Sequence, residues 1–510
     1  MFLFLFHSLT PMRKGPSMTK PNQPLFIRFP TPERVQKVHV LGVAGSAMGA
    51  FACMLQEAGY EVRGSDLGMY PPMSDMLAAR GVQVSLGWDP AHLDWGPDWV
   101  IVGNVCRQDN PIAQAAMARG IAYASFPQAV SDLFLAARSP VVVTGTHGKT
   151  TTTNLTAHLL RQRFEGVGLL AGGVGANFGS PFVIGAEGAP FVIEGDEYDT
   201  AFFDKGPKFL HYRPDVAIIN NIEFDHADIY DSVEEIEENF ERLCGLITPG
   251  RLLLVNGDDA RALRVSRAAQ GEVVTYGFGE GCAWRASEVA LGPSGAEFLL
   301  TPPAEVGVAV RARSPLPGQY NVGNALAALA VAVGRYGVPL AVALAGLASF
   351  RGVQKRQEVV ADVGGVLVME DYANHPTAAA ETLRGLRAQY PTHRIWAIYE
   401  PKSNTARRSV HQGEYAAALA EAPIARLTRP FKKEDRFPAE LRLNLDALVA
   451  SLRERGVDAA ACLEIDDLVE ELAREARAGD LLVFMSSSHF EGGVTRTIER
   501  LREREGVARA

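Results

Sequence analysis

The sequence contains few cysteines, and no two of them form a C-x-x-C pair. Five cysteines stand far apart among 510 residues, at Cys53, Cys106, Cys244, Cys282 and Cys462. This spacing argues against a disulfide framework and predicts reduced, mostly buried thiols in a cytoplasmic protein.

The chain also lacks an excess of positive charge and any long apolar run. Its net charge of -9 argues against a general nucleic-acid binder, which carries a basic face. No apolar run approaches the ~18 residues that span a bilayer, so no membrane partner is expected. The apolar start of the chain has no basic residue before it and is a poor signal peptide. Residues 1–30 are predicted to be a disordered or over-extended N-terminus.

Short apolar stretches alternate with helical patterns along the rest of the chain, and 47% of its residues are apolar. This alternation predicts an α/β protein whose mostly parallel sheets are covered by helices on both faces. This alternation of strands and helices begins anew at two points, which predicts three domains at 31–138, 139–352 and 353–510. We expect the first and the last to be Rossmann-like.

A glycine-rich turn follows the first predicted strand. Gly42, Gly45 and Gly49 lead into an apolar helix, and the next strand ends at Asp66. The pattern is typical of a βαβ unit with a carboxylate where a ribose-binding residue stands. The glycine spacing differs from G-x-G-x-x-G, so a nicotinamide site and glycines that serve only a tight turn both remain possible.

A phosphate loop is predicted within the stretch VVVTGTHGKTTTTNLTAHLL, residues 141–160. Glycines between a buried strand and a helix start let backbone N–H groups and the helix dipole face a phosphate chain. Lys149 adds a positive charge for the β- and γ-phosphates, and the Thr150 hydroxyl is a ligand for Mg²⁺. The alternative, a helix start capped by threonine hydroxyls, leaves Lys149 unexplained. The loop therefore predicts an ATP site.

Two acidic clusters follow later predicted strands. IEGDEYD holds Glu194, Asp196, Glu197 and Asp199, and NNIEFDHAD holds Glu223, Asp225, His226 and Asp228. Because the carboxyl ends of parallel strands share one edge, we expect both clusters beside the phosphate loop. Carboxylates and a histidine beside a triphosphate suit one or two Mg²⁺ ions.

These motifs together resemble the Mur ligase family. G-T-H-G-K-T-T, EGDEYD, NNIEFDH, LPGQYNVGN and EDYANHPT occur in the order of that family, over about residues 35–500. The resemblance implies an N-terminal UDP-sugar domain, a central P-loop-type ATPase domain and a C-terminal peptide-binding domain. It also implies an ATP-dependent ligase that forms an amide bond through an acyl phosphate.

HVLGVAGSAMG resembles the family branch that takes UDP-N-acetylmuramate. Within it, EGDEYDTAFFDKGPKF and YEPKSNTARRSVHQ resemble the recycling enzymes that attach the tripeptide L-alanyl-γ-D-glutamyl-meso-diaminopimelate. The alternative is an enzyme that adds free L-alanine. A nicotinamide-dependent oxidoreductase would leave Lys149 unexplained, and a non-catalytic ATP-binding protein would not need the acidic clusters.

Residue roles are expected from the motifs and the resemblance. The predicted catalytic residues are Lys149, Glu194 and His226, and the predicted Mg²⁺ ligands are Thr150 and Glu194, with His226 at a second metal. The predicted ATP site comprises Gly145, Thr146, His147, Gly148, Lys149, Thr150, Thr151, Asn321, Arg356, Asp371 and His375. The predicted UDP-sugar site comprises Gly42, Gly45, Ser46 and Asp66.

The peptide site is predicted in the loop that follows RIWAIY. Ser403 and Asn404 are expected to bind peptide amides, and Arg407 or Arg408 a carboxylate, because arginine pairs with carboxylates through two hydrogen bonds. The sequence departs from the common family pattern at Tyr320, which replaces a histidine, and Asn374 stands where the alanine-adding enzymes usually have histidine. We expect a monomer or weak dimer in the cytoplasm.

Overall fold

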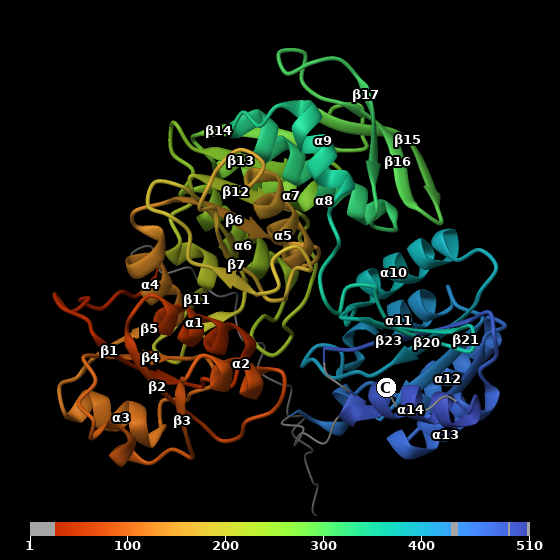
Figure 1. Ribbon diagram of the computed structural model, residues 1–510, viewed down its shortest axis with the longest axis horizontal. Helices are drawn as coiled ribbons and strands as arrows, with labels where there is room; N and C mark the ends of the chain where they lie inside the picture. Colours follow the sequence, from red (N-terminus) through yellow and green to blue (C-terminus); the bar gives the residue numbers. More distant parts are fainter. Residues whose placement is uncertain (1–25, 430–436, 488–489, 507–510) are drawn as a thin grey trace, which may run out of the picture.

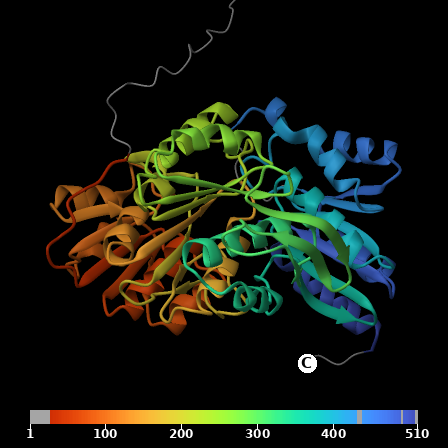
Figure 2. The same cartoon turned by 90° about the horizontal axis from the view of Figure 1, so that it is seen from above.

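The computed structural model describes residues 26–429, 437–487 and 490–506, and they form three α/β domains, each around its own sheet. The N-terminal and C-terminal domains lie on opposite sides of the molecule, with the central domain joining them (Figures 1 and 2). This three-domain α/β architecture confirms the predicted fold class. The domain bounds themselves stay predictions.

The N-terminal domain has a five-stranded sheet in the order β3-β2-β1-β4-β5, and every pair in it is parallel. Its strands are β1 Lys37–Leu41, β2 Glu61–Asp66, β3 Gln83–Leu86, β4 Trp99–Val102 and β5 Ala122–Ser125, and its helices are α1 Ser46–Glu57, α2 Met73–Ala79, α3 Pro111–Ala118 and α4 Phe126–Val130. The strand order reverses between β1 and β4, so the Gly42 turn opens at the crevice where α/β sheets bind ligands.

The central domain has a ten-stranded sheet in the order β17-β16-β15-β14-β13-β12-β6-β9-β7-β8. Its strands are β6 Ser139–Thr144, β7 Gly168–Leu170, β8 Phe182–Val183, β9 Pro190–Glu194, β12 Val216–Ile219, β13 Leu252–Asn256, β14 Glu272–Gly277, β15 Trp284–Gly292, β16 Gly295–Thr301 and β17 Val310–Ser314; β10 Asp199–Ala201 and β11 Asp204–Pro207 form a separate hairpin. Its helices are α5 Lys149–Leu160, α6 Val233–Cys244, α7 Ala260–Val265, α8 Gln319–Leu329 and α9 Leu340–Ala348. Parallel strands β9 and β12 flank β6, which brings both acidic clusters to the edge where β6 ends.

The C-terminal domain has a six-stranded sheet in the order β18-β19-β23-β20-β21-β22, parallel except for β18 against β19. Its strands are β18 Glu358–Val363, β19 Val366–Asp371, β20 Arg394–Tyr399, β21 Ile424–Thr428, β22 Asp458–Cys462 and β23 Asp480–Met485, and its helices are α10 Pro376–Gln389, α11 Gln412–Leu419, α12 Leu445–Glu454, α13 Ile465–Glu475 and α14 Gly493–Arg504.

Short 3₁₀ or π helices occur in all three domains. They are η1 Pro90–Leu93, η2 Ser131–Leu135, η3 Lys208–His211, η4 Ser266–Ala268, η5 Ala330–Arg335, η6 Ser409–His411, η7 Ala439–Leu441 and η8 Phe490–Gly492.

Most of the predicted N-terminal tail, residues 1–25, lies outside the described part of the chain. Phe26 and Phe29, which the prediction also included, contact the domains. The Phe26 ring lies 4.6 Å from the His211 ring, and the Phe29 backbone N–H donates to Gln128 Oε1 over 3.0 Å. Aromatic side chains that find a partner surface order these residues.

Two further observations concern the cysteines and the lengths of the helices. All five cysteines are free, and all but the half-buried Cys282 are buried, as predicted. Among the described residues, none of the helices combines the length and apolarity needed to cross a membrane.

Candidate nucleotide and metal site

A cavity of about 520 Å³ opens where the three domains meet. The N-terminal domain contributes Ser46 and Phe126 to its wall, and the central domain contributes the phosphate loop and both acidic clusters. The C-terminal domain adds residues between Asp371 and Thr382, among them Asn374 and Thr377. The wall of this cavity therefore brings together residues that lie more than 300 positions apart in the chain.

The phosphate loop runs from the end of β6 into α5, as the sequence predicts. Gly145 and Gly148 have φ values of 127° and 77°, which favour glycine. A Cβ atom at Gly148 would lie 2.6 Å from Asn324 Oδ1, so a side chain there has no room. The loop thus turns tightly and presents the N-terminus of the 12-residue helix α5 to the cavity.

A buried amide network that the sequence analysis missed holds this loop in place. The His147 backbone N–H donates to Asn221 Oδ1 over 2.7 Å, and Asn220 Nδ2 donates to Thr152 Oγ1 over 3.2 Å. Thr152 Oγ1 donates in turn to Asn324 Oδ1 over 3.0 Å. The only signal in the sequence was the Asn-Asn pair directly after a predicted strand.

Lys149 bridges the phosphate loop and the first acidic cluster. Its Nζ donates to the Gly145 carbonyl over 2.7 Å and to Glu197 Oε2 over 2.8 Å. Burial alone lowers the pKa of Lys149, but the carboxylates of Glu197 and Asp196 outweigh it and raise the pKa overall. Lys149 is therefore a fixed cation at the mouth of the loop.

Glu194 and Thr150 form one candidate Mg²⁺ group. The Thr150 hydroxyl donates to Glu194 Oε2 over 3.0 Å, and the Gly172 backbone N–H donates to the same oxygen over 2.8 Å. Arg356 reaches over from the segment before β18, and its Nη2 donates to Thr150 Oγ1 over 3.2 Å. Hydroxyl and carboxylate oxygens are the ligands that Mg²⁺ prefers, so this pair fits the ion.

His226 belongs to a second group, with Asp196 and Glu197, whose ligand atoms all lie within 4.8 Å of one another. His226 Nε2 lies 3.3 Å from Glu197 Oε1. Burial alone would lower the pKa of His226, but Glu197 and Asp225 raise it to about 9. A metal at this group would have to displace the imidazole proton.

Thr146, Thr151, Asn321, Arg356 and Asp371 of the predicted ATP site line the same cavity, whereas the buried His375 is not part of its wall. Asn321 Oδ1 accepts from Asn324 Nδ2 over 3.0 Å, and Tyr320 OH accepts from Gln357 Nε2 over 2.5 Å. Asp371 accepts backbone N–H groups of the neighbouring chain, which gives it a structural role as well. Thr146 and Thr151 also stand on the wall. Their contacts with ATP stay predictions.

The predicted UDP-sugar residues lie around the β1–α1 turn. Gly42, with φ of 80°, donates its N–H to the Ser65 carbonyl, and Asp66 Oδ2 accepts from the Ala44 N–H over 2.9 Å. Asp66 therefore fastens the turn. Of the predicted set, Ser46 lies on the cavity wall, while Gly45 caps α1.

The predicted peptide loop faces the central domain. Asn404 Nδ2 donates to Asp228 Oδ2 over 2.7 Å, and Ser403 Oγ accepts a local backbone N–H, from Ala406. Arg407 is 4% exposed, and its Nη2 donates to Asn404 Oδ1, so it supports Asn404. Binding of a substrate carboxylate by Arg407 or by the half-buried Arg408 stays a prediction.

Three family descriptions match consecutive parts of the chain. Residues 37–138 match "Mur ligase family, catalytic domain", residues 143–332 match "Mur ligase middle domain", and residues 355–488 match "Mur ligase, glutamate ligase domain". Together the matches span most of the three domains.

Individual relatives cover nearly the whole chain. The UDP-N-acetylmuramate–L-alanyl-γ-D-glutamyl-meso-2,6-diaminoheptandioate ligase of Escherichia coli K12 is 36% identical over 461 residues, 89% of this chain and 96% of the relative. The UDP-N-acetylmuramate–L-alanine ligase of Streptomyces coelicolor is 33% identical over 460 residues, 89% of this chain and 96% of the relative. The crystal structure of a murein peptide ligase from Psychrobacter arcticus 273-4 superimposes with a TM-score of 0.71 at 32% identity, covering 91% of this chain and 98% of that one.

Proposed function

This chain belongs to the Mur ligase family, and we propose that it joins the lactyl carboxylate of UDP-N-acetylmuramate to the α-amine of L-alanyl-γ-D-glutamyl-meso-diaminopimelate, with ATP as co-substrate. The observation that carries the proposal is the single cavity where the phosphate loop, both acidic groups and the C-terminal domain meet. The similarity to relatives named for this tripeptide supports the choice of peptide.

The residues of the cavity suit two successive displacements. The lactyl carboxylate attacks the γ-phosphorus, ADP leaves, and an acyl phosphate results. The peptide amine then attacks the acyl carbon, loses a proton and expels phosphate. Neither step needs a covalent bond to the protein, so positioning and charge neutralisation supply the catalysis.

Each charged group has a place in this scheme. Lys149 and the loop N–H groups bind the β- and γ-phosphates. Thr150 with Glu194, and His226 with Asp196 and Glu197, would hold Mg²⁺, which neutralises charge on the phosphates. Arg356 stands beside Thr150 and adds a second cation from the C-terminal side. A cytoplasmic location and the oligomeric state stay predictions.

The test is a ligation assay with UDP-N-acetylmuramate, ATP and either the tripeptide or free L-alanine. We expect phosphate release and product with the tripeptide, and a kcat/KM for L-alanine at least ~10²-fold lower, because free alanine leaves the polar groups of a peptide site unpaired. Tripeptide with an acetylated α-amine is the control and should form no product. Equal use of free L-alanine would favour the alanine-adding enzyme, and no turnover with either would refute the ligase.

Replacing Arg408 with alanine should raise the KM for the tripeptide about tenfold or more, because it removes a charged hydrogen bond to a substrate carboxylate. The KM values for ATP and UDP-N-acetylmuramate should stay unchanged. Arg455→Ala, at an exposed position after α12, is the matched control. Wild-type tripeptide kinetics in Arg408→Ala would remove Arg408 from the peptide site.

A further inference from the structure

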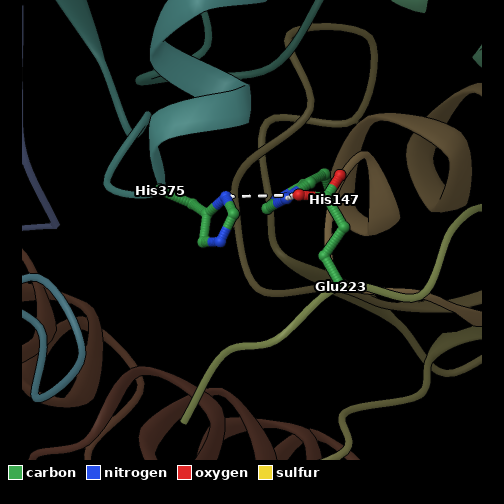
Figure 3. Close-up of side chains that lie close together, drawn as sticks. All are labelled: His147, Glu223 and His375. Atoms are coloured by element: carbon green, nitrogen blue, oxygen red, sulfur yellow. Dashed lines mark ion pairs between the residues drawn. The ribbon is translucent and has the colours of Figure 1, made fainter. Parts of the chain in front are cut away.

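Two histidines and a glutamate converge at the boundary between the central and C-terminal domains. His147 comes from the phosphate loop, Glu223 from the segment after β12, and His375 from the residue that caps α10. Glu223 Oε2 lies 3.6 Å from His147 Nε2 and 3.7 Å from His375 Nδ1. Figure 3 shows the three side chains side by side, and their ligand atoms all lie within 4.8 Å of one another.

The His147 ring carries a buried nitrogen without a hydrogen bond. Its Nε2 is shielded from solvent and has no hydrogen-bond partner among the described residues. At 3.6 Å, Glu223 is too far to supply one. Buried polar atoms in folded proteins normally have a partner, so an orphaned imidazole nitrogen facing a carboxylate indicates a missing ligand.

His375 is held as a metal ligand would be. Its Nε2 lies 3.3 Å from the Phe224 carbonyl, which makes this nitrogen the donor. Its Nδ1, on the side of Glu223, accepts the Thr377 backbone N–H over 3.3 Å, a bond that a metal at Nδ1 would replace. Thr377 Oγ1 donates to Glu223 Oε2 over 2.6 Å. Such outer hydrogen bonds orient ligands in metal sites.

We propose that His147, Glu223 and His375 bind a Zn²⁺ ion, at a site distinct from the two candidate Mg²⁺ groups. Two imidazoles and one carboxylate suit zinc, whereas the group of His226 with Asp196 and Glu197 has two carboxylates and one imidazole and is richer in the oxygen ligands that Mg²⁺ prefers. Ligands of a tetrahedral zinc ion lie roughly 3.4 Å apart, so small side-chain movements complete the geometry. The fourth position faces the cavity, since His147, Glu223 and Thr377 line it.

A zinc ion here connects two domains. His147 and Glu223 belong to the central domain, while His375 caps α10, the first helix of the C-terminal domain after β19. The ion would add bonds across this boundary beside the phosphate loop. Zinc would therefore stabilise the arrangement in which the central and C-terminal domains are in contact, and it would oppose their separation.

The test is a zinc titration of the full-length chain without substrates, in which a chelating indicator reports the free Zn²⁺. Excess Mg²⁺ is present so that it occupies the two candidate Mg²⁺ groups. We expect one tightly bound Zn²⁺ and a raised melting temperature for the wild type. His375→Asn should bind zinc at least ~10-fold more weakly, since loss of an outer-shell partner alone costs that much. Asparagine keeps the cap of α10, which protects the fold.

Two matched variants make the test specific. His411→Gln changes a ring 4.8 Å from that of His375 but outside the proposed ligand set, and it should bind zinc like the wild type. His226→Gln, in the other group, should do the same. Undiminished zinc binding in His375→Asn overturns the proposal, as does zinc binding that is lost in His226→Gln alone or absent from the wild type.

Discussion

Lys149→Ala is expected to lower ligation turnover at least ~10²-fold, the loss that follows removal of one preorganised charge-stabilising group. Lys149 stands at the first position of α5 and is the cation of the phosphate loop. Phosphate release in the presence of both substrates measures the effect. Near-normal turnover would remove the ATP site from this loop.

The same substitution should also lower stability. The Lys149 side chain is 12% exposed and pairs with Glu197, which is 2% exposed, so the variant leaves a buried carboxylate with one cation fewer. His226, 3.3 Å from Glu197, remains and limits the loss. Turnover is therefore compared well below the melting temperature. Lys205→Ala, whose side chain is 69% exposed, is the matched control and should keep wild-type turnover.

Glu194→Gln is the second substitution with a large expected effect. The amide oxygen can still accept from the Gly172 N–H, so the local fold should persist. The negative charge beside Thr150 is lost, however, and Mg²⁺ binds weakly to an amide in place of a carboxylate. We expect at least ~10²-fold lower turnover at limiting Mg²⁺, with partial recovery as Mg²⁺ is raised.

A titration of turnover against Mg²⁺ measures this effect. Glu238→Gln, at an exposed position of α6, is the matched control. An unchanged Mg²⁺ requirement in Glu194→Gln would show that Glu194 is not a ligand. A loss of turnover that no Mg²⁺ concentration relieves, together with unfolding, would instead assign Glu194 a structural role.

The sequence by itself determined the fold class and the location of the phosphate loop. Buried β-branched runs such as Val141–Val143, followed by Gly145, Gly148 and Lys149, specify a strand, a turn and a helix through local sterics. The carboxyl ends of neighbouring parallel strands lie at one edge of a sheet. Because β9, β6 and β12 are parallel neighbours, this alone predicts that Glu194 and His226 lie beside the phosphate loop.

Only the tertiary structure decided which of these groups face one another. Lys149 forms an ion pair with Glu197, and the buried Arg407 donates a hydrogen bond to Asn404. The His147 ring contacts the ring of His375, which belongs to another domain. None of these pairings has a sequence signal, since side-chain contacts between distant segments depend on how the domains pack. Periodicity and motif spacing describe a few neighbouring residues, whereas burial and charge at this cavity are set jointly by all three domains.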